Sequence, residues 1–578
     1  DPEKGYGYSE ESKAMLNTSH GFVPWDDLHH ISLSVTDGVH DGRWAFGNAN
    51  NTPRIARIDL KTFKTAEIIE IPNSAGNHSS PFITENSEYV VAGTRFSVPM
   101  TNGITDVPIN TYKENFKGTV SFINIDKESG KMGIAFQILL PGVDFDLSRA
   151  GKGKSHGWFF FSCYNSERAN TLLEVNASKF DKDFIMAVNW KKAEEYVKAG
   201  KGVKKSVSYA HNTFDDKTHT ATSTLEKEVI MLDPKDCPDM VYLMPCPKSP
   251  HGCDTDPTGE YIVGSGKLAA VIPVFSFTKM QEAINAKNFE GDYDGLPVLK
   301  YDAVLHGEVK KPGLGPLHTE FDANGNAYTS FFVSSEIVKW RLSDLSVLDR
   351  VPTYYSVGHL CVPGGPTKKP WGKYVIAYNK ITKDRYLPTG PELTQSAQLY
   401  DISGDKMKLI LDFPTIGEPH YAEAVPAELL SKNSTKIYKI EDNHHPYVTK
   451  GEKEAKVERK GNEVHVYMSS IRSHFVPDNI EGVKLGDVVY FHVTNLEQDW
   501  DVPHGFAVKG ANNAELLIMP GETSTLMWKP DRVGVFPFYC TDFCSALHQE
   551  MQGYIRISPA NSNVPLTFST GTNQPPIN

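Results

Sequence analysis

The residues best suited to chemistry lie near the end of the chain. Residues 540–551 read CTDFCSALHQEM and place two thiols, an imidazole and a thioether on one segment, and His504 lies about one hairpin upstream. Soft sulfur combined with imidazole suits copper, and a mononuclear blue-copper centre needs only one Cys with two His and a weak axial Met. Because the second Cys on the same loop can bridge two metal ions, the spacing predicts a dinuclear copper site for electron transfer.

Zinc and an inert Cys/His loop are the alternatives for this segment. Cys-x3-Cys-x3-His approaches the spacing of structural zinc sites. Met551 adds nothing to a zinc site, however, and the neighbouring residues read as strands rather than as a zinc-finger helix. Val488 to Leu496 alternates between two faces after a Gly-Asp turn, and Ser524 to Tyr539 reads as further strand. A His near one strand and a Cys-to-Met loop between two late strands favour a cupredoxin-like domain that binds copper.

The rest of the chain reads as short strands with few amphipathic helices. A local pattern recurs in which a His is followed by a polar turn and then by an aromatic-led strand. It runs from His30 to Trp44, His78 to Tyr89, His251 to Tyr261, His318 to Tyr328 and, more loosely, His359 to Tyr374. Strand-rich repeats of about 40–50 residues are typical of propeller blades. Because equivalent points of the blades lie on a ring, we expect these histidines to meet at one mouth of the axial channel.

Each of these histidines alone could be an ordinary core or surface residue, since His is of intermediate burial. His29 and His30 are adjacent, and in a regular strand they would point to opposite faces. Both can therefore serve one site only if the backbone turns locally. Several other histidines stand beside Gly or Pro, in loops where a backbone can approach a cofactor closely: His251, His318, His359 and His420.

Composition limits the class of protein. The 578 residues, of which 39% are hydrophobic, exceed one ordinary domain and predict two or three. Mean hydropathy is -0.37, and no run approaches the ~20 apolar residues of a membrane-spanning helix. The net charge of -12 argues against nucleic acid and favours a basic redox partner. The chain starts at Asp1, which we interpret as the mature form of an exported, periplasmic protein.

The predicted fold class is all-β, with a seven-bladed β-propeller followed by a cupredoxin-like Greek-key β-sandwich. We assign residues 1–442 to the propeller, 443–461 to a charged linker, 462–560 to the cupredoxin domain and 561–578 to a polar tail. Five further cysteines are odd in number and cannot all pair. They are expected to be buried free thiols, with Cys237 to Cys246 as one possible bridge: Cys163, Cys237, Cys246, Cys253 and Cys361.

Nearly end to end, the chain resembles the nitrous oxide reductases, exported copper enzymes of bacterial denitrification. The matching motifs are Asp27 to His30, Tyr164 to Glu167, Gly313 to His318, Lys380 to Pro388, Glu418 to His420 and the copper loop. The resemblance implies a four-copper, sulfide-bridged cluster called CuZ, bound by imidazoles at seven positions. All seven positions are His here: His29, His30, His78, His251, His318, His359 and His420. The ring argument alone reaches all of them except His29 and His420.

The resemblance also implies a CuA centre in the second domain. Its ligands would be His504, Cys540, Cys544, His548, Met551 and the backbone carbonyl of Asp542. Many members of the family carry Trp at that carbonyl position. A carbonyl ligand tolerates the change to Asp, but an electron-transfer role of the aromatic ring is put in doubt. An acidic residue there resembles the CuA domain of cytochrome oxidase.

A calcium site is implied as well, at Tyr164, Glu167, Asp181 and the backbone oxygen of Val175. Oxygen ligands suit a hard cation. The family has Asn where this chain has Ser249, so the coordination can differ. A hydrogen-bonded loop without metal is the alternative.

The implied reaction is the two-electron reduction of nitrous oxide to dinitrogen and water. Lys380 would stabilise negative charge or deliver a proton, and Asp27 would orient a ligand ring. Cytochrome c or a small copper protein would donate electrons, within a head-to-tail homodimer that pairs the CuA of one subunit with the CuZ of the other. Two rivals are a CuA-bearing fragment of a terminal oxidase and a copper storage or electron-relay protein whose propeller binds nothing.

Overall fold

The computed structural model describes residues 8–24, 26–99, 108, 112–166, 182–380, 396–415, 419–430, 439–498, 502–511 and 515–570. The chain divides into two compact units. The propeller unit consists of Asn17–Gly21 and Trp25–Ser431, and the sandwich unit of Asp1–Leu16, Phe22–Pro24 and Lys432–Asn578. No helix among the described residues is long and apolar enough to cross a bilayer.

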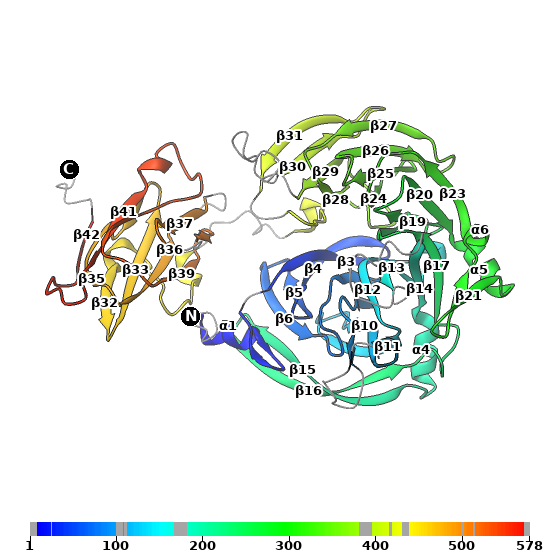
Figure 1. Ribbon diagram of the computed structural model, residues 1–578, viewed down its shortest axis with the longest axis horizontal. Helices are drawn as coiled ribbons and strands as arrows, with labels where there is room; N and C mark the ends of the chain where they lie inside the picture. Colours follow the sequence, from blue (N-terminus) through cyan, green and yellow to red (C-terminus); the bar gives the residue numbers. More distant parts are fainter. Residues whose placement is uncertain are drawn as a thin grey trace. The chain divides into compact units, whose positions relative to one another are not determined.

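Six four-stranded antiparallel blades follow one another through the described part of the propeller unit and stand around a ring (Figure 1). The first blade contains β3 (Leu28–Thr36), β4 (Val39–Ala49), β5 (Arg54–Asp59) and β6 (Lys64–Glu70), and the second contains β7 (Ser79–Ile83), β8 (Tyr89–Gly93), β10 (Phe116–Ile125) and β11 (Met132–Leu140). The third contains β12 (Val143–Ala150), β13 (Trp158–Ser166), β14 (Lys182–Asn189) and β17 (Val241–Pro247), and the fourth contains β18 (Pro250–Thr255), β19 (Tyr261–Gly266), β20 (Val271–Ser276) and β23 (Leu305–Lys310). The fifth contains β24 (Pro316–Phe321), β25 (Asn326–Phe331), β26 (Glu336–Arg341) and β27 (Val347–Pro352), and the sixth contains β28 (Val357–Cys361), β29 (Tyr374–Asn379), β30 (Ser396–Asp401) and β31 (Lys408–Pro414).

The first strands of the blades line the axis, because those of neighbouring blades contact one another: β3 with β7, β7 with β12, β12 with β18, β18 with β24, and β24 with β28. The all-β propeller predicted from the sequence is confirmed. The count of seven blades stays a prediction, since residues 381–395, 416–418 and 431–438 lie outside the described ranges.

Hydrophobic cores fill the spaces between neighbouring blades. Phe122 and Phe136 of the second blade pack with Phe159 and Phe161 of the third in one such cluster. Further clusters join the third blade to the fourth, the fourth to the fifth and the fifth to the sixth. Strands covered on both faces read as continuous apolar runs, which explains the sequence WFFFS at the start of β13. This packing fixes the inner strands against one another.

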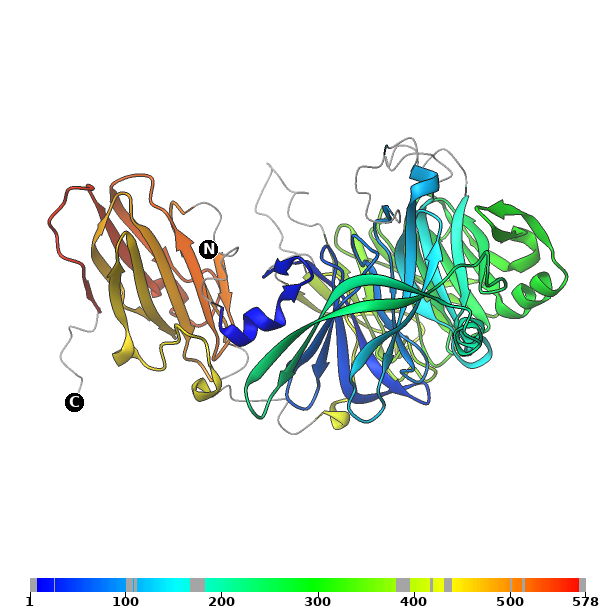
Figure 2. The same cartoon turned by 90° about the horizontal axis from the view of Figure 1, so that it is seen from below.

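A long hairpin, β15 (Val203–Asp215) and β16 (Thr220–Leu232), is inserted between the last two strands of the third blade. β15 pairs with β6 and β16 with β11, so the hairpin joins the outer edges of the first two blades (Figure 2). Short elements occupy the other connections: β9 (Val98–Pro99), α2 (Tyr112–Asn115), η3 (Gly153–Ser155), α4 (Trp190–Lys198), α5 (Phe277–Asn285), β21 (Phe289–Tyr293), β22 (Leu296–Leu299), α6 (Tyr301–Val304) and η6 (Ala427–Leu429). Near the start of the chain lie α1 (Glu10–Met15), β1 (Asn17–Thr18) and β2 (Gly21–Phe22).

Two sheets form the sandwich unit. One contains β32 (Lys456–Lys460), β33 (Glu463–Ile471), β34 (His474–Val476), β36 (Val488–Asn495) and β39 (Thr523–Trp528). The other contains β35 (Asn479–Lys484), β37 (His504–Val508), β38 (Glu515–Ile518), β40 (Gly534–Tyr539), β41 (Gln552–Ser558) and β42 (Thr567–Ser569). One shared core holds Phe491, Phe506 and Phe538. Helical turns η7 (Ile440–Asp442) and η8 (Glu452–Glu454) precede the sheets, and η9 (His548–Glu550) lies before β41. β32 and β42 lie in residues expected to form the linker and the tail.

Candidate metal centres

Breaks in strand register place the propeller histidines. The pairing of β3 with β4 is interrupted between Leu28 and Ile31, so His29 and His30 stand in an irregular two-residue step. The register also shifts around His251, His318 and His359 in the first strands of their own blades. Bulges of this kind bend a strand and redirect its side chains. They provide the local turn that the adjacent pair His29 and His30 requires to face one site.

Seven imidazoles form one continuous cluster at the axis: His29, His30, His78, His251, His318, His359 and His420. One ligand atom from each of His29, His30, His78 and His420 lies within 4.8 Å of the others. The ring centroids of His29 and His420 are only 3.4 Å apart. The structure thus brings residues 29 and 420 together from opposite ends of the propeller sequence.

His359 joins the two halves of this cluster. Its ring centroid lies 4.8 Å from those of His251, His318 and His420 and 5.3 Å from that of His30. The side chain is fully buried, and neither of its ring nitrogens has a hydrogen-bond partner among the described residues. A buried polar atom without a partner costs about 1–3 kcal/mol. The position of His359 is therefore explained best by a bound group that both the ring and its neighbours face.

Other rings also offer a lone pair. Nδ1 of His30 lies 2.8 Å from the backbone oxygen of His78, and Nδ1 of His78 lies 2.6 Å from that of Asp146. Donation to a carbonyl puts the proton on Nδ1 and leaves the lone pair on Nε2. Burial lowers the pKa of His78 to about 3 and those of His30 and His251 well below the usual value. Buried, neutral imidazoles are the form that binds copper.

Asp146 is a site residue that the sequence argument missed. It lies on β12, whose blade, among the six described, is the one with no His of the cluster on its first strand or directly before it. Its Oδ1 is 3.3 Å from Nδ1 of His78 and 3.5 Å from Nε2 of His251, and its Oδ2 is 3.0 Å from Nζ of Lys267. Register shifts surround it as they surround the histidines. The signal that could have found it is this equivalent place in the blade, now filled by a carboxylate.

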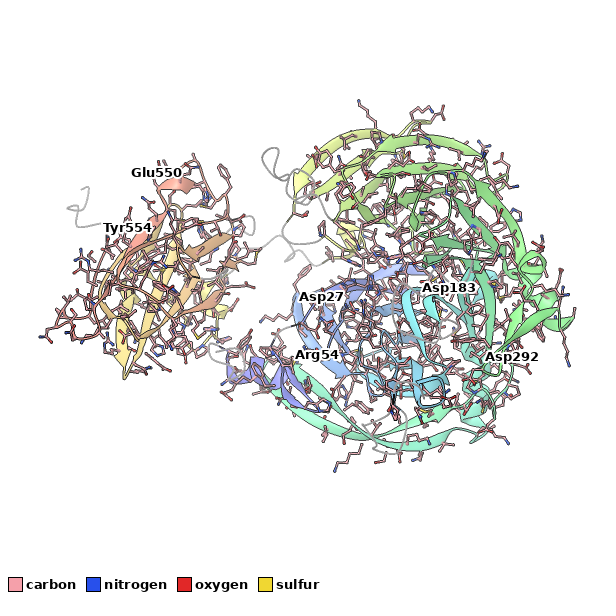
Figure 3. The ribbon with its side chains drawn as sticks, in the orientation of Figure 1. Asp27, Arg54, Asp183, Asp292, Glu550 and Tyr554 are labelled. Atoms are coloured by element: carbon pink, nitrogen blue, oxygen red, sulfur yellow. The ribbon has the colours of Figure 1, made fainter. Side chains whose placement is uncertain are left out.

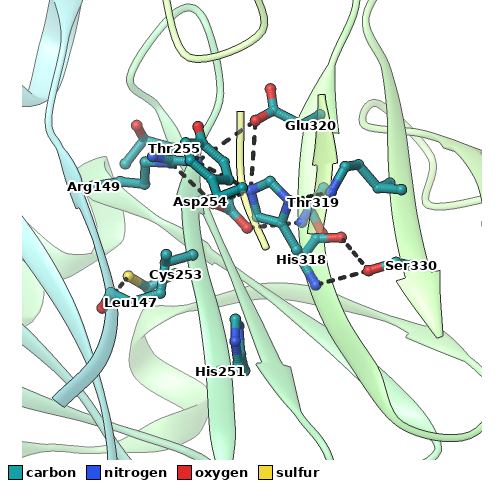
Figure 4. Close-up of polar contacts among 12 residues, drawn as sticks. Leu147, Arg149, His251, Cys253, Asp254, Thr255, His318, Thr319, Glu320 and Ser330 are labelled. Carbon is teal, nitrogen blue, oxygen red and sulfur yellow. Dashed lines mark hydrogen bonds and ion pairs between the residues drawn. The ribbon is translucent and has the colours of Figure 1, made fainter. Parts of the chain in front are cut away.

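Both ring nitrogens of His318 face protein groups. Nδ1 accepts the Leu360 N–H at 2.9 Å. Nε2 lies 3.0 Å from a guanidinium nitrogen of Arg149 and 3.5 Å from oxygens of both Asp254 and Glu320 (Figure 4). The side chain is fully buried. Its ring belongs to the cluster, while its nitrogens hold it to the layer beneath.

Lys380 and Asp27 lie beside the cluster. Nζ of Lys380 is 2.8 Å from Nδ1 of His420, and the lysine stem packs against Gly358, where an added Cβ would lie only 2.1 Å from Lys380 Cε. Asp27, labelled in Figure 3, has a carboxylate oxygen 3.1 Å from Nδ1 of His29. Burial acts to raise the pKa of Asp27, but the hydrogen bond from Asn50 and the nearby His29 lower it overall.

The sandwich loop assembles a second site. Sγ of Cys540 is 3.8 Å from Nδ1 of His504 and 3.2 Å from the backbone oxygen of Asp542. Sγ of Cys544 is 3.8 Å from Nδ1 of His548 and 3.8 Å from Sδ of Met551. The four other groups expected around the second copper site thus surround the two cysteines.

The chemistry of these donors fits a cationic centre. Burial raises the pKa of Cys540 to about 12 and lowers that of His504 to about 4. A thiolate at that depth requires compensating positive charge, and two coppers would supply it. Glu497, which the sequence argument also missed, places Oε1 3.5 Å from Nε2 of His504 and accepts hydrogen bonds from Arg472. The carboxylate is therefore positioned to orient the ring.

Two other predictions meet different outcomes. Glu167, Val175, Asp181 and the side chain of Tyr164 lie outside the described residues, so the calcium site stays a prediction. All seven cysteines are free, and the possible bridge between Cys237 and Cys246 is not formed. The odd count had already excluded complete pairing.

Comparison with known proteins places the chain in a family. Residues 350–420, which contain His359, Lys380 and His420, match the nitrous oxide reductase propeller repeat. The nitrous-oxide reductase of Stutzerimonas stutzeri is 32% identical over 97% of this chain and 84% of its own length. That of Pseudomonas fluorescens is 31% identical, with the same coverage. The chain belongs to the nitrous-oxide reductase family.

The second unit has its own relative. Subunit 2 of the cytochrome c oxidase of Thermus thermophilus is 36% identical over 18% of this chain and 71% of its own length. The match lies in the C-terminal region and confirms the predicted cupredoxin-like fold there. Family membership makes the protein an oxidoreductase and implies copper, nitrous oxide as substrate and a redox donor.

Proposed function

We propose that the chain reduces nitrous oxide at a CuZ cluster in the propeller, with electrons that enter through a CuA pair in the sandwich. The overall reaction is N2O + 2 H⁺ + 2 e⁻ → N2 + H2O. The observation that carries the proposal is His359, a fully buried ring with two unpartnered nitrogens in the middle of six other imidazoles. Nitrous oxide is an inert, weak ligand, so several electron-rich metals acting together suit it better than one.

The seven propeller histidines would hold the four-copper, sulfide-bridged cluster, and His318 would exchange one of its protein contacts for the metal: His29, His30, His78, His251, His318, His359 and His420. When bound, the cluster supplies electrons and open metal positions to the substrate. The rings hold metal without adding charge, and backbone carbonyls at His78 and Asp146 fix two of their tautomers. The inter-blade cores make these contacts rigid, which keeps the rings in place through the reaction.

Two polar side chains would serve the chemistry directly. The ammonium of Lys380 stands at the edge of the ring cluster, where a cation stabilises negative charge on a reduced oxygen and can donate a proton to it. Asp27 would orient His29 through its carboxylate. Lys380 is otherwise a strand-end lysine buried against Gly358, and that position supports the functional role.

The sandwich site would be the electron entry. His504, Cys540, Asp542, Cys544, His548 and Met551 would bind CuA, with Asp542 using its backbone oxygen. Asp542 in place of Trp keeps that oxygen near Cys540, at 3.2 Å. We propose cytochrome c or a small copper protein as donor. The head-to-tail homodimer, the calcium ion and the periplasmic location also rest on the family, and each remains a proposal.

The test is copper loading followed by turnover. Protein purified without oxygen should carry copper in both units and sulfide in the propeller, and should convert ¹⁵N-labelled nitrous oxide to labelled dinitrogen with a reduced dye as electron source. Protein that carries both kinds of centre but forms no dinitrogen would contradict the proposal. Copper confined to the sandwich after reconstitution would support the electron-relay alternative instead.

A further inference from the structure

Beneath the ring cluster lies a second layer of polar side chains that no part of the reaction described above uses. Arg149 follows Asp146 on β12, Asp254 follows His251 on β18, and Glu320 follows His318 on β24. Each stands two or three residues further along a first strand. The layer therefore draws on the first strands of three blades (Figure 4).

Arg149 is the centre of this layer. Its Nε donates to Asp254 at 3.2 Å, and one terminal nitrogen donates to the hydroxyl of Tyr421 at 2.8 Å. That nitrogen also lies 3.0 Å from Nε2 of His318 and 3.6 Å from Glu320. The arginine is only 5% exposed. A buried guanidinium keeps its charge and fixes several partners through its planar array of donors.

Tyr421 connects Arg149 to the histidine rings of the cluster. Its ring centroid lies 5.3 Å from that of His359, 5.6 Å from that of His318 and 5.9 Å from that of His30. Its hydroxyl is held twice, because it accepts from Arg149 and donates to Glu423 at 3.2 Å. A shift of this ring would displace three members of the cluster at once.

The charges of the layer also matter for any redox centre above it. Asp254 accepts hydrogen bonds from Arg149 and from the Thr319 N–H, and this pair balances one positive with one negative charge. Loss of the guanidinium would leave Asp254 unpaired next to His318. A buried carboxylate that loses its partner is destabilising and shifts the local potential towards negative values.

We propose that Arg149 and Tyr421 are positioning residues for the copper cluster: together they fix the rings of His30, His318 and His359, and Arg149 also supplies the positive charge that faces Asp254 and Glu320 beneath the cluster. The inference rests on the proposed function, since it assigns roles around that same cluster. Neither residue touches the substrate in this scheme. Their effect is on the orientation of the ligands and on the reduction potential of the copper.

Three substitutions separate the two roles in the copper-loaded protein. Tyr421→Phe keeps the ring and the charge but removes both hydrogen bonds, so the absorption and electron-spin spectra of the propeller copper should change. Its kcat should fall about 10–100-fold, as for other residues that orient metal ligands, with KM for nitrous oxide nearly unchanged. Arg149→Met should in addition lower the reduction potential, because it removes a positive charge. Arg149→Lys should restore the potential but not the spectrum.

Matched controls come from the same unit. Tyr328→Phe removes another buried hydroxyl bonded to a carboxylate, and Arg57→Lys alters another buried Arg–Glu pair. Neither residue has a contact with a ring of the cluster among the described residues, so spectrum and potential should match those of the wild type.

If Arg149→Met does not fold, Tyr421→Phe and Arg149→Lys carry the test. Wild-type protein without turnover would contradict the proposed function, whereas active wild type with an unchanged spectrum and kcat in Tyr421→Phe would overturn this inference alone.

Discussion

The two metal centres of this chain are built in opposite ways. In the sandwich, five of the six expected groups lie within residues 540–551, and only His504 comes from another strand. In the propeller, the seven rings come from residues 29 to 420, and β12 contributes Asp146 to the same ring of positions. The sandwich site is formed almost entirely by a single loop. The propeller site forms only because several blades meet around an axis.

This difference predicts how each site fails. A change in the Cys loop affects contacts within one turn and leaves the propeller untouched. A change at the axis acts on several rings at once, because five of the seven rings contact three or more others, His251 and His318 both contact His359, and the blades share their cores. Substitutions in the two units should therefore separate local from distributed failure.

The largest effect should follow His359→Ala. This ring contacts four others, and both of its nitrogens lack partners. Nitrous oxide reduction should fall by more than the roughly 10–100-fold typical of a partner beyond the metal ligands. The propeller should lose its copper while the sandwich keeps the mixed-valence CuA signal. Copper counting with electron-spin spectroscopy checks both. Loss of the CuA signal too would point to general misfolding and contradict a separate propeller effect.

His318→Ala is also expected to lower nitrous oxide reduction and to remove copper from the propeller, and it tests a second histidine of the cluster. If the Arg149 layer holds His318 as strongly as its contacts indicate, the substitution also frees Asp254 and Glu320 from their ring partner. Thermal unfolding of the metal-free variant should then occur at lower temperature than that of metal-free His359→Ala, which leaves no carboxylate without a partner.

Cys544→Ser tests the opposite failure. Removal of one thiol should abolish the CuA absorption. Turnover driven by a protein donor should fall by about two orders of magnitude or more, which exceeds the loss expected when a residue that only orients a metal ligand is removed. The propeller copper and its sulfide absorption should stay. Ser545→Ala in the same loop is the control and should keep the CuA spectrum. Loss of propeller copper in Cys544→Ser would show that the two sites are not independent.

Asp146→Asn should have a smaller effect. The amide keeps the size of the side chain but loses the charge that faces His78, His251 and Lys267. Copper affinity of the propeller or its kcat should fall about 10–100-fold. Asp349→Asn alters another Asp–Lys pair of the same unit, on β27, the last strand of the fifth blade, and should leave both quantities unchanged. Equal behaviour of the two variants would remove Asp146 from the site.

The sequence could predict the sandwich loop better than the propeller for a physical reason. Ligand type and spacing in residues 540–551 describe nearly the whole site, and the alternating strands around it indicate the fold. The propeller histidines share only a weak local pattern, from which five could be placed on a ring. His29 and His420 came from family resemblance, since the irregular step in β3 and the segment after β31 have no clear signal of their own.

Three residues that act through charge escaped the sequence argument. Asp146, Arg149 and Glu497 look like ordinary charged residues in short strands or loops. Their roles depend on which blade or strand faces them, and register breaks decide that. A carboxylate at a position where other blades carry His becomes informative only once the blades are aligned in space.

The smallest predicted effect concerns acid and again separates the two units. In the propeller, burial lowers the pKa of His78 to about 3 and the pKa values of His30, His251 and His359 well below the usual value. In the sandwich, burial lowers the pKa values of His504 and His445 to about 4 and the pKa of His492 to about 2. In unfolded protein a His takes up its proton near pH 6.5. Stability is therefore unaffected above that pH and is lost as the pH falls from 6.5 towards 4, by up to about 1.4 kcal/mol per pH unit for each ring.

Because the propeller has more such rings, its metal-free form should lose protection faster than the sandwich between pH 7 and pH 5. Hydrogen exchange measured on peptides from the two units checks this, after correction for the intrinsic rate. His492→Phe should flatten the pH dependence of the sandwich alone. Equal slopes in both units would mean that the buried rings of the propeller are hydrated without metal, and that copper rather than the fold keeps them neutral.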